Sequence, residues 1–310
     1  MDRRDFIKKG LVSGIAAGAA TMGVFNINKA LGLSEPYTST LPWDLVAVRG
    51  GEPGAMFDMA IASMGGMKQF LKKGQTVVLK PNIGWDSTVE KAGNTNPQLI
   101  STIIKHCFDA GAKNVYVFDH TCDNWTKCYA SSGIEKAAND AGAKVVGGNT
   151  ENYYQNVTIT GTKILKTVKV HELILQSDVF INVPILKNHT SCKVTAGLKN
   201  LMGTVWDRQY WHGNDLQQCI GEFPMYRKPD LNIVDAYAVM KRNGPRGVSA
   251  ADVEKMKSLV LSTDIVAADA AATKFFGKEP NEIKYLKVAS ELKLGNMNLD
   301  QLRVNRIKAA

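Results

Sequence analysis

The sequence predicts an α/β fold: a mostly parallel sheet with helices on both faces and a small antiparallel insertion. Three observations lead to this prediction. Short apolar, β-rich runs alternate along the chain with helical patterns. These runs are continuous rather than alternating, which is typical of strands covered on both faces. The repeated order of strand, helix and strand favours parallel pairing through right-handed crossovers.

The first predicted elements lie between residues 76 and 118. Residues 76–79 predict a buried strand. Asn96 is expected to cap a helix that has Pro97 at its first position and ends near Gly111. Residues 114–118 predict the next strand. This stretch alone therefore predicts one strand–helix–strand unit.

The later elements continue the same pattern. Residues 134–141 predict a helix, and Asp264 or Thr263 is expected to cap an Ala-rich helix that carries Asp269. Residues 151–170 predict the small antiparallel insertion, and residues 184–230 an elaborated loop region. The remaining predicted strands cover residues 144–146, 178–182, 231–235 and 259–261.

The first thirty residues resemble a twin-arginine signal peptide. Arg3 and Arg4 are followed by Phe6 and Lys8, and an apolar run rich in small residues extends over residues 10–25. This run is shorter than a membrane-spanning helix requires; the alternative is an uncleaved amphipathic anchor. We therefore expect residues 1–30 to be a leader read by the twin-arginine export machinery, and residues 31–310 to be a single α/β domain. The expected location is the periplasm or the outer cell surface.

Composition limits the classes of partner. The chain has 45% hydrophobic and 22% charged residues and a net charge of +9, of which residues 1–30 carry +3. The remaining excess favours anionic ligands, and no Lys/Arg run with interleaved aromatic residues predicts a nucleic-acid partner. None of the five cysteines forms a C-x-x-C pair, so an iron–sulfur cysteine motif is absent. Cys122 and Cys128 could pair in an oxidising compartment.

Four predicted strands end in a polar residue: Lys80, Asp119, Asn182 and Asp235. In an open parallel sheet, ligands bind at the carboxyl ends of the strands. A helix cap or a loop hydrogen bond would explain any one of these residues alone. The four together, followed by loops rich in polar residues, predict a binding site at one edge of the sheet.

The loops at these strand ends supply further candidates. Lys80 ends a buried strand, where an unpaired ammonium group is costly, so it should meet a carboxylate or an anion. Lys and His residues combined with Gly, Thr and Asn predict an oxyanion or phosphate cradle without Walker spacing. The candidates for ligand binding outside the strand ends are Asn82, Lys187, His189, Thr195, Lys199, Asn200 and Arg246.

In this order, these motifs resemble the domain of unknown function 362 family. The matching stretches are VVLKPNIGW, TNPQLISTIIKHCFDAGAKNVYVFD, SDVFINVPILKNHTSCKVTAGLKNLMG, PDLNIVDAYAVMKRNGPRG and LVLSTDIVAADAAA. Many members carry a ferredoxin-type domain, which implies redox partner proteins. A second resemblance, to the nickel-pincer lactate racemases, has Ser177-Asp178, His189 and Gly197-Leu198-Lys199 as its counterparts. It supports a ligand site at this sheet edge.

We expect an enzyme that acts on a small anionic ligand. A bound cofactor, either a metal or an organic group, is of unknown identity. His189 is the candidate general acid/base because an ordinary imidazole titrates near neutral pH. Lys187 would neutralise the anion, and Asp119 or Asp235 would orient His189 or hold a metal. The alternatives are a ligand-delivery protein without catalysis and a metal-binding redox accessory protein that uses His189, Cys192, Asp207 or His212. The segment 206–212 could also be an aromatic lid.

Overall fold

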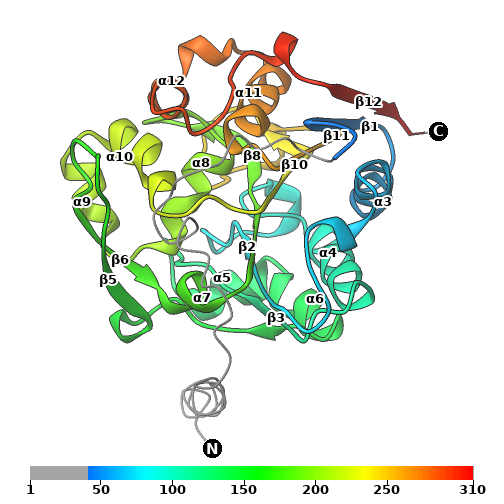
Figure 1. Ribbon diagram of the computed structural model, residues 1–310, viewed down its shortest axis with the longest axis horizontal. Helices are drawn as coiled ribbons and strands as arrows, with labels where there is room; N and C mark the ends of the chain where they lie inside the picture. The colour runs from blue at the N-terminus through cyan, green and yellow to red at the C-terminus, as the bar shows by residue number, and fades with distance from the viewer. Residues whose placement is uncertain (1–40, 310) are drawn as a thin grey trace, which may run out of the picture. The chain divides into compact units, whose positions relative to one another are not determined.

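The computed structural model describes residues 41–309, so the expected leader at residues 1–30 lies outside the described part. A ten-stranded sheet organises these residues, in the order β12-β1-β11-β10-β7-β2-β3-β4, with β8 and β9 attached to β10 (Figure 1). The strands are β1 (Leu45–Arg49), β2 (Thr76–Pro81), β3 (Asn114–Val117), β4 (Lys144–Val145), β7 (Val179–Val183), β8 (Ile185–His189), β9 (Lys193–Thr195), β10 (Leu231–Met240), β11 (Val253–Ser262) and β12 (Val304–Lys308).

The predicted parallel sheet is confirmed for its central strands. β10, β7, β2, β3 and β4 pair in parallel, and β8 also runs parallel to β10. Two strands are reversed: β11 is antiparallel to both of its neighbours, β10 and β1, and β9 is antiparallel to β8. The carboxyl ends of β2, β3, β7 and β8 therefore gather at one edge, where the sequence predicts a site.

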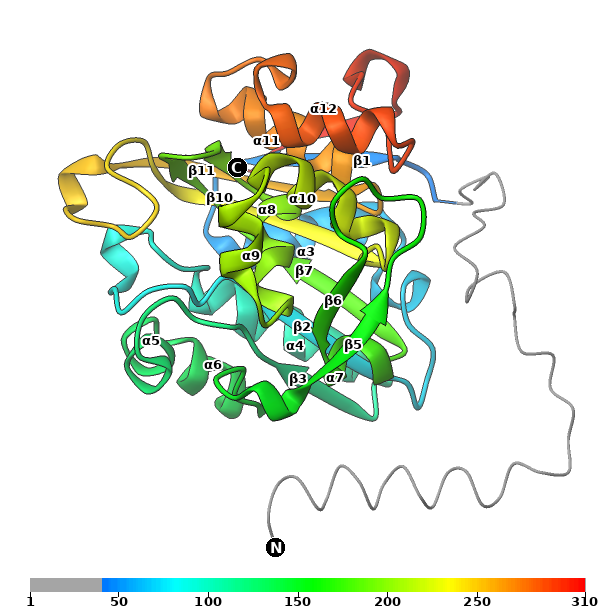
Figure 2. The ribbon, with the colours of Figure 1, turned by 90° about the vertical axis from the view of Figure 1, so that its left-hand side faces the viewer.

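Helices cover both faces of the sheet, as predicted. The α-helices are α3 (Pro53–Ser63), α4 (Pro97–Asp109), α5 (Trp125–Ser131), α6 (Ile134–Asp140), α7 (Glu172–Gln176), α8 (Gly197–Asn200), α9 (Arg208–Gly213), α10 (Leu216–Glu222), α11 (Ile265–Phe276) and α12 (Lys284–Glu291). Figure 1 shows α9 and α10 on one side of the central strands and α3 and α4 on the other, and Figure 2 views the strands from the side of α9 and α10. Adjacent side chains of β2 therefore point to opposite faces of the sheet. Val78 packs in the core beneath α8, α10, α11 and α12, whereas Val77 and Leu79 pack in the core beneath α3, α4 and α6.

The predicted caps and the antiparallel insertion are also confirmed. The Asn96 side chain accepts a hydrogen bond from Gln98 N at the start of α4, and Asp264 accepts from Val266 N and Ala267 N at the start of α11. The insertion is a two-stranded ribbon of β5 (Tyr154–Thr158) and β6 (Thr167–His171). None of the helices within residues 41–309 is both long enough and apolar enough to cross a membrane.

Two predictions of local structure are wrong. Residues 184–230 are not mainly loop, because they contain the β8–β9 hairpin and the helices α8, α9 and α10. Asp235 does not end a strand either. β10 continues to Met240, beyond an irregularity between Ala236 and Ala238, because β8 provides it with a second parallel partner. The sheet therefore extends past the predicted edge on this side.

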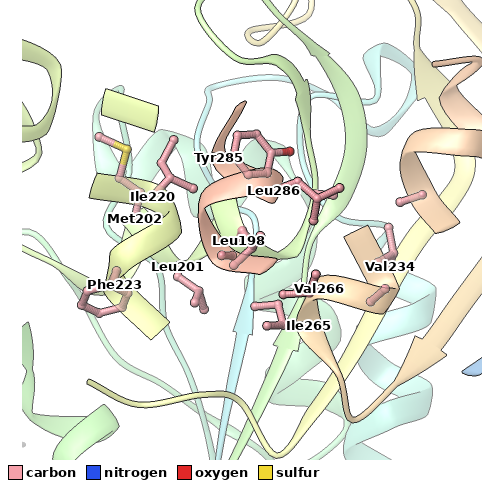
Figure 3. Packing of buried hydrophobic residues seen from close by; sticks show 14 of the residues in the cluster. Leu198, Leu201, Met202, Ile220, Phe223, Val234, Ile265, Val266, Tyr285 and Leu286 are labelled. Carbon is pink, nitrogen blue, oxygen red and sulfur yellow. The ribbon is translucent and has the colours of Figure 1, made fainter. Parts of the chain in front are cut away.

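The short helix α8 is anchored by apolar packing. Its residue Leu198, and Leu201 directly after it, lie among side chains of α10, α11 and α12 (Figure 3). The neighbouring residues drawn there include Ile220, Phe223, Ile265, Val266, Tyr285 and Leu286. A helix of four residues has little stability of its own, so this packing holds α8 at the carboxyl edge of the sheet.

Candidate functional site

A cavity of about 350 Å³ opens at the carboxyl ends of the central strands. It is lined by residues that follow β2 and β3, by the β8–β9 hairpin and by the segments around α8 and α9. The lining residues are Lys80, Asn82, Gly84, Trp85, Asp119, His120, Cys122, Lys187, His189, Thr195, Lys199, Asn200, Met202, Gly203, Arg208, Gln209, His212 and Pro245. The prediction of a pocket at this edge, made from the strand ends, thus corresponds to a cavity in the structure.

The centre of the site is a buried ion pair. Lys80 Nζ lies 2.9 Å from Asp119 Oδ1, and the side chains are 1% and 2% exposed. Burial lowers the pKa of Lys80, and the Asp119 carboxylate opposes that shift. The second oxygen, Asp119 Oδ2, accepts a hydrogen bond from Ile83 N at 2.7 Å. Lys80 therefore has the carboxylate partner that the sequence predicts, and Asp119 also holds the loop that follows β2.

Gly203 is required beside this ion pair. A Cβ atom at Gly203 would overlap Asp119 Oδ1 and would lie 2.6 Å from Lys80 Nζ. Because both partners are buried, neither has space in which to withdraw. Glycine here allows the backbone after α8 to pack directly against the pair.

Lys187 is the most unusual titratable group of the site. Its Nζ donates to Asn82 Oδ1 at 2.9 Å and to Gly93 O at 2.5 Å. Burial lowers the pKa of Lys187 to about 7. A neutral amine uses both of its hydrogens in these two bonds and keeps one lone pair. Because Lys187 also lines the cavity, it is placed to exchange a proton with a ligand there.

A chain of amides, of which Asn82 is half-buried and the others are buried, crosses the sheet beneath the cavity. Asn82 Nδ2 donates to Asn200 Oδ1 at 3.0 Å, Asn200 Nδ2 to Asn182 Oδ1 at 2.9 Å, and Asn182 Nδ2 to Asn232 Oδ1 at 3.1 Å. Lysine ammonium groups can only donate, so Lys187 and Lys80 require oxygen at the atoms they meet on Asn82 and Asn200. The two lysines thereby set the orientation of the whole amide chain.

Lys199 enters the site from α8, whose first turn is held by a carboxylate. Asp269 of α11 accepts from Gly197 N at 2.6 Å and from Leu198 N at 3.0 Å. Burial raises the pKa of Asp269 to about 7 against these two bonds. The Lys199 ammonium group itself contacts only a weak acceptor, Met202 Sδ at 3.1 Å, and burial lowers its pKa. Lys199 therefore lines the cavity without a carboxylate partner among the described residues.

The structure does not favour the acid/base role predicted for His189. Burial, with the nearby charges of Lys199 and Lys187, lowers the pKa of His189 to about 3. Its Nδ1 accepts from Ser191 N at 3.1 Å, so the neutral ring carries its proton on Nε2. Among the hydrogen bonds of residues 41–309, none joins His189 to Asp119 or Asp235, so the orienting role predicted for these carboxylates has no support in the structure. His189 instead presents a neutral hydrogen-bond donor.

The lining residues that were not predicted as ligand-binding or catalytic include His120, Cys122 and Arg208, the last of which lies in the segment considered as a lid. Arg208 Nη1 donates to His120 O at 2.9 Å and contacts Cys122 Sγ at 3.3 Å, and Arg208 Nη2 donates to Thr121 O at 2.6 Å. His120 directly follows the strand-end residue Asp119, so the strand-end argument could have found it. Arg208 has no such local signal, because it reaches the site from α9, far along the chain.

The segment predicted as an aromatic lid presents polar groups to the cavity instead. Arg208, Gln209 and His212 line it. Trp211 is buried in the core, and Trp206 stacks on His120 with a ring-centroid distance of 5.1 Å. The segment thus closes one side of the cavity with hydrogen-bonding side chains.

Two buried side-chain atoms of the lining lack a hydrogen-bond partner within the described part of the chain, Asp119 Oδ1 and Thr195 Oγ1, and only Asp119 Oδ1 has a counter-charge, Lys80. Thr195 is 3% exposed, and its Oγ1 forms no hydrogen bond within the described part of the chain. A buried hydroxyl without a partner costs about 1–3 kcal/mol. A ligand atom in the cavity would supply the missing bond, so this hydroxyl is the clearest sign of a ligand-binding position.

Several predicted site residues lie elsewhere. Asp235 accepts from Asn96 N at 2.8 Å and Tyr237 N at 3.0 Å, and thus joins β10 to the start of α4. Arg246 is 60% exposed and pairs with Asp123 at 3.1 Å. Neither residue lines the cavity. Asp178, one of the residues matched to the lactate racemases, precedes β7 and accepts from Thr76 N at the start of β2. It therefore lies at the edge of the sheet opposite the cavity.

All five cysteines are free thiols, so the pairing considered for Cys122 and Cys128 is not present. Cys128 is buried in α5 with its Sγ 3.9 Å from Gly84 O, and Cys122 is exposed beside Arg208. Within residues 41–309 there is also no group of three or more His, Cys, Asp or Glu side chains that could hold a metal ion.

The charges of the cavity favour an anion. Four lysine and arginine side chains, Lys80, Lys187, Lys199 and Arg208, line it together with a single carboxylate, Asp119. Burial is the largest cause of the lowered pKa of Lys80, Lys187 and Lys199. A bound anion would offset that cost by stabilising the protonated lysines.

A larger cavity of about 640 Å³ lies between α11 and the strands β1 and β12. Its charged residues have both signs, and two of them, Lys274 and Glu279, pair with each other at 2.5 Å. It lies away from the carboxyl ends of the parallel strands. The converging charges therefore identify the smaller cavity as the candidate site.

A family profile and a relative are similar to this chain in sequence. The profile of a family described as a domain of unknown function (DUF362) matches residues 77–274. A thylakoid-associated protein of Synechocystis sp. is 24% identical over 239 residues, which cover 74% of this chain and 72% of that protein.

Two solved structures are similar at low identity. The lactate racemase apoprotein of Thermoanaerobacterium thermosaccharolyticum has a TM-score of 0.49 and 11% identity, over 74% of this chain and 56% of that chain. A Thermotoga maritima protein has a TM-score of 0.45 and 10% identity, over 78% of this chain and 60% of that chain. This chain thus spans less than two thirds of either structure.

Proposed function

This chain belongs to the DUF362 family, and from that membership and the cavity we propose that it is an enzyme acting on a small anionic substrate. The substrate binds at the carboxyl ends of the strands, and Lys187 exchanges a proton with it. The observation that carries the proposal is the convergence of four cationic side chains on a cavity with one carboxylate. Buried charges without counter-charges are costly, so this arrangement is explained by an anionic occupant.

The size of the cavity limits the substrate. A volume of about 350 Å³ is at the lower end of the range of ligand pockets. Lys199 has no carboxylate partner and Lys80 is already paired with Asp119. The anionic group of the substrate therefore belongs on the Lys199 and Arg208 side, with Lys187 opposite.

Lys187 supports catalysis rather than binding alone. An acid/base group works best when its pKa lies near the operating pH, and the pKa of Lys187 is about 7. Its contacts with Asn82 Oδ1 and Gly93 O fix the amine while leaving its third position unused by the described residues. The neutral His189 ring contributes a hydrogen bond from Nε2 to the substrate.

The test measures proton uptake on anion binding. Oxalate is titrated into the protein by calorimetry in two buffers of different ionisation enthalpy, about one pH unit above the pKa of Lys187. A bound anion raises the pKa of Lys187, so we expect uptake on the order of one proton per oxalate. Lys187→Met should bind more weakly and take up no proton. Lys105→Met, which removes an exposed lysine of α4, is the matched control.

The outcomes separate the parts of the proposal. Absence of oxalate binding would overturn the anion site, and binding without proton uptake would overturn the role of Lys187. Proton transfer to carbon is tested by NMR in D₂O with a panel of small carboxylates. Exchange or conversion that is lost in Lys187→Met supports an enzyme; bound but unchanged carboxylates would instead indicate a ligand-delivery protein.

We further propose that the protein works outside the cytoplasm after export by the twin-arginine machinery. The support is the Arg3-Arg4 pair followed by Phe6, Lys8 and a short apolar run. This route carries folded proteins, so a cavity completed by residues far apart in the sequence would form before export.

A further inference from the structure

Cys122 differs from the other cysteines in both exposure and surroundings. Cys107, Cys128, Cys192 and Cys219 are buried, whereas Cys122 is exposed and lines the cationic cavity. Its Sγ lies 3.3 Å from Arg208 Nη1. Thiolates are the reactive form of cysteine and occur beside Arg and Lys side chains in sites where they react. This is the one thiol of the chain that both solvent and a ligand in the cavity can reach.

The position of Arg208 is itself fixed. Its guanidinium also donates to the backbone carbonyls of His120 and Thr121, the two residues before Cys122. The cation is therefore held against the cysteine loop independently of the sulfur. Lys187 and Lys199 line the same cavity, so a negative sulfur there faces several cationic groups.

The buried Thr195 hydroxyl is an independent sign of a ligand. It lies in the β8–β9 hairpin, not in the cysteine loop, and its Oγ1 has no partner within residues 41–309. A ligand oxygen that accepts from Thr195 would remove the cost of the unpaired hydroxyl. The cavity thus holds a thiol, a proton-exchanging amine, a hydroxyl donor and cations for an anionic group.

We propose that Cys122 is the catalytic nucleophile of this cavity and that its substrates are small carboxylates bearing an aldehyde or ketone carbon. This inference rests on the proposed function of the same site. The thiolate sulfur forms a bond to the carbonyl carbon, and the π electron pair of the C=O bond moves to oxygen. The Lys187 ammonium supplies the proton to that oxygen, which leaves a neutral amine and a hemithioacetal. Lys199 and Arg208 hold the carboxylate.

The experiment compares two alkylating reagents that differ in charge. In each reaction the thiolate sulfur displaces iodide and forms a bond to the CH₂ carbon of iodoacetate or iodoacetamide. The rate at Cys122 is followed by peptide mass spectrometry and divided by the rate of the same reagent with the urea-unfolded chain. We expect the normalised rate to be about tenfold higher for the anionic reagent, equivalent to about 1.4 kcal/mol. Cys122→Ser supplies the unlabelled reference.

Two controls connect this preference to the cavity. Saturating oxalate should slow iodoacetate labelling in the unaltered protein, and Lys199→Met should remove most of the preference while Lys105→Met keeps it. A normalised ratio of one or less would overturn the role of Cys122. If oxalate still binds in that case, the proposed anion site stands; if oxalate does not bind, the proposed function fails as well.

Discussion

Two lysine side chains of the site, Lys80 and Lys187, are buried, although their charged forms are more stable in water. Lys187 is 2% exposed and Lys80 is 1% exposed, yet each has only one or two strong acceptors. Burial dominates the electrostatics of both, so their charged forms are destabilised in the unliganded protein. These buried lysines lower the stability of the folded protein and provide amines with lowered pKa values, an arrangement that is common at functional sites.

The first prediction at this scale concerns Lys187 and pH. The folded-state pKa of Lys187 is lowered to about 7, so the folded chain binds fewer protons than the unfolded chain above that pH. The free energy of unfolding should therefore rise between about pH 7 and about pH 10, and the contribution of Lys187 should be constant below pH 7. In Lys187→Met, urea unfolding should show a rise that is smaller by a few kcal/mol. Lys105→Met should keep the full rise, and an unchanged rise in Lys187→Met would contradict the prediction.

The second prediction concerns Gly203. In Gly203→Ala the new methyl group would overlap Asp119 Oδ1 and approach Lys80 Nζ to 2.6 Å, so the buried ion pair must shift. We expect a destabilisation of about 1–3 kcal/mol in chemical unfolding, together with weaker oxalate binding. Gly213→Ala is the matched control because its Cβ would meet no atom within 4 Å. Equal losses in the two variants would show that the crowding beside the ion pair has no consequence.

Residue by residue, the sequence was informative where the site follows a strand or a short motif. Lys80, Asn82, Lys187, His189, Thr195, Lys199 and Asn200 were all predicted as ligand-binding or catalytic residues and all line the cavity. Arg208 and Cys122 were not predicted as site residues, because their contact arises only when α9 folds over the loop after β3. Arg246 was misplaced because a basic residue beside a turn indicates exposure as readily as it indicates a ligand.

At the scale of elements, the site depends on two connections between segments distant in the sequence. Asp269 of α11 holds the first turn of α8, and the amide chain joins β2, α8, β7 and β10. The chain continues from Asn232 Nδ2 to Ser262 O in β11 at 3.4 Å. These connections fix Lys199 and Asn200 relative to the strand ends, which a four-residue helix could not do by itself.

Asp269→Asn tests the connection to α8. An amide can accept from only one of Gly197 N and Leu198 N, because its NH₂ group faces the other donor. We expect a loss of about 1–3 kcal/mol in unfolding free energy and a reduced affinity for oxalate by calorimetry. Thr273→Val, one turn further along α11, removes only a bond to Asp269 O and should keep the affinity. Wild-type affinity in Asp269→Asn would show that α8 is held by packing alone.

Elements with a clear period or cap were predictable from the sequence, whereas strand directions and partners were not. The strand–helix–strand unit ending in β3, the caps Asn96 and Asp264 and the β5–β6 ribbon depend on local signals, and all are confirmed. The apolar run of β11 was recognised, but its antiparallel direction depends on pairing with β1 and β10. β1 and β12 were not predicted. β12 alternates partly buried and exposed residues, so it lacks the continuous apolar run used to find the other strands.

At the scale of the whole molecule, buried acids and the buried lysine have opposite effects on stability. Burial raises the pKa of Asp235 to about 6 and that of Asp269 to about 7. Stability from these acids is present below their unfolded pKa values and is lost as pH rises through 6 and 7. The contribution of Lys187 increases only above pH 7. These groups together lower the stability of the unliganded chain near neutral pH, where an anion would restore part of it.

The proposed export is tested with the leader itself. Residues 1–30 are fused to a reporter protein that is active only after it has been exported in the folded state. A second fusion carries the double substitution Arg3→Lys/Arg4→Lys. An arginine pair is read by a receptor rather than by the lipid, so we expect the double variant to retain the reporter in the cytoplasm. Lys9→Arg keeps the charge outside the pair and should not block export. Equal export of all three fusions would contradict the twin-arginine proposal.

The position of β1 has a consequence for the timing of folding. β1 has two neighbours, β11 and β12, with Leu45 opposite Ser262 on one side and Val304 on the other. During synthesis, neither partner of β1 exists until the ribosome has delivered β11, about two hundred residues further along the chain. Contacts of such large sequence separation form slowly because closing long loops is entropically costly. A chain that stops before β11 would leave both edges of β1 unpaired, so β1 completes its pairing only after the other parallel strands of the sheet have been synthesised.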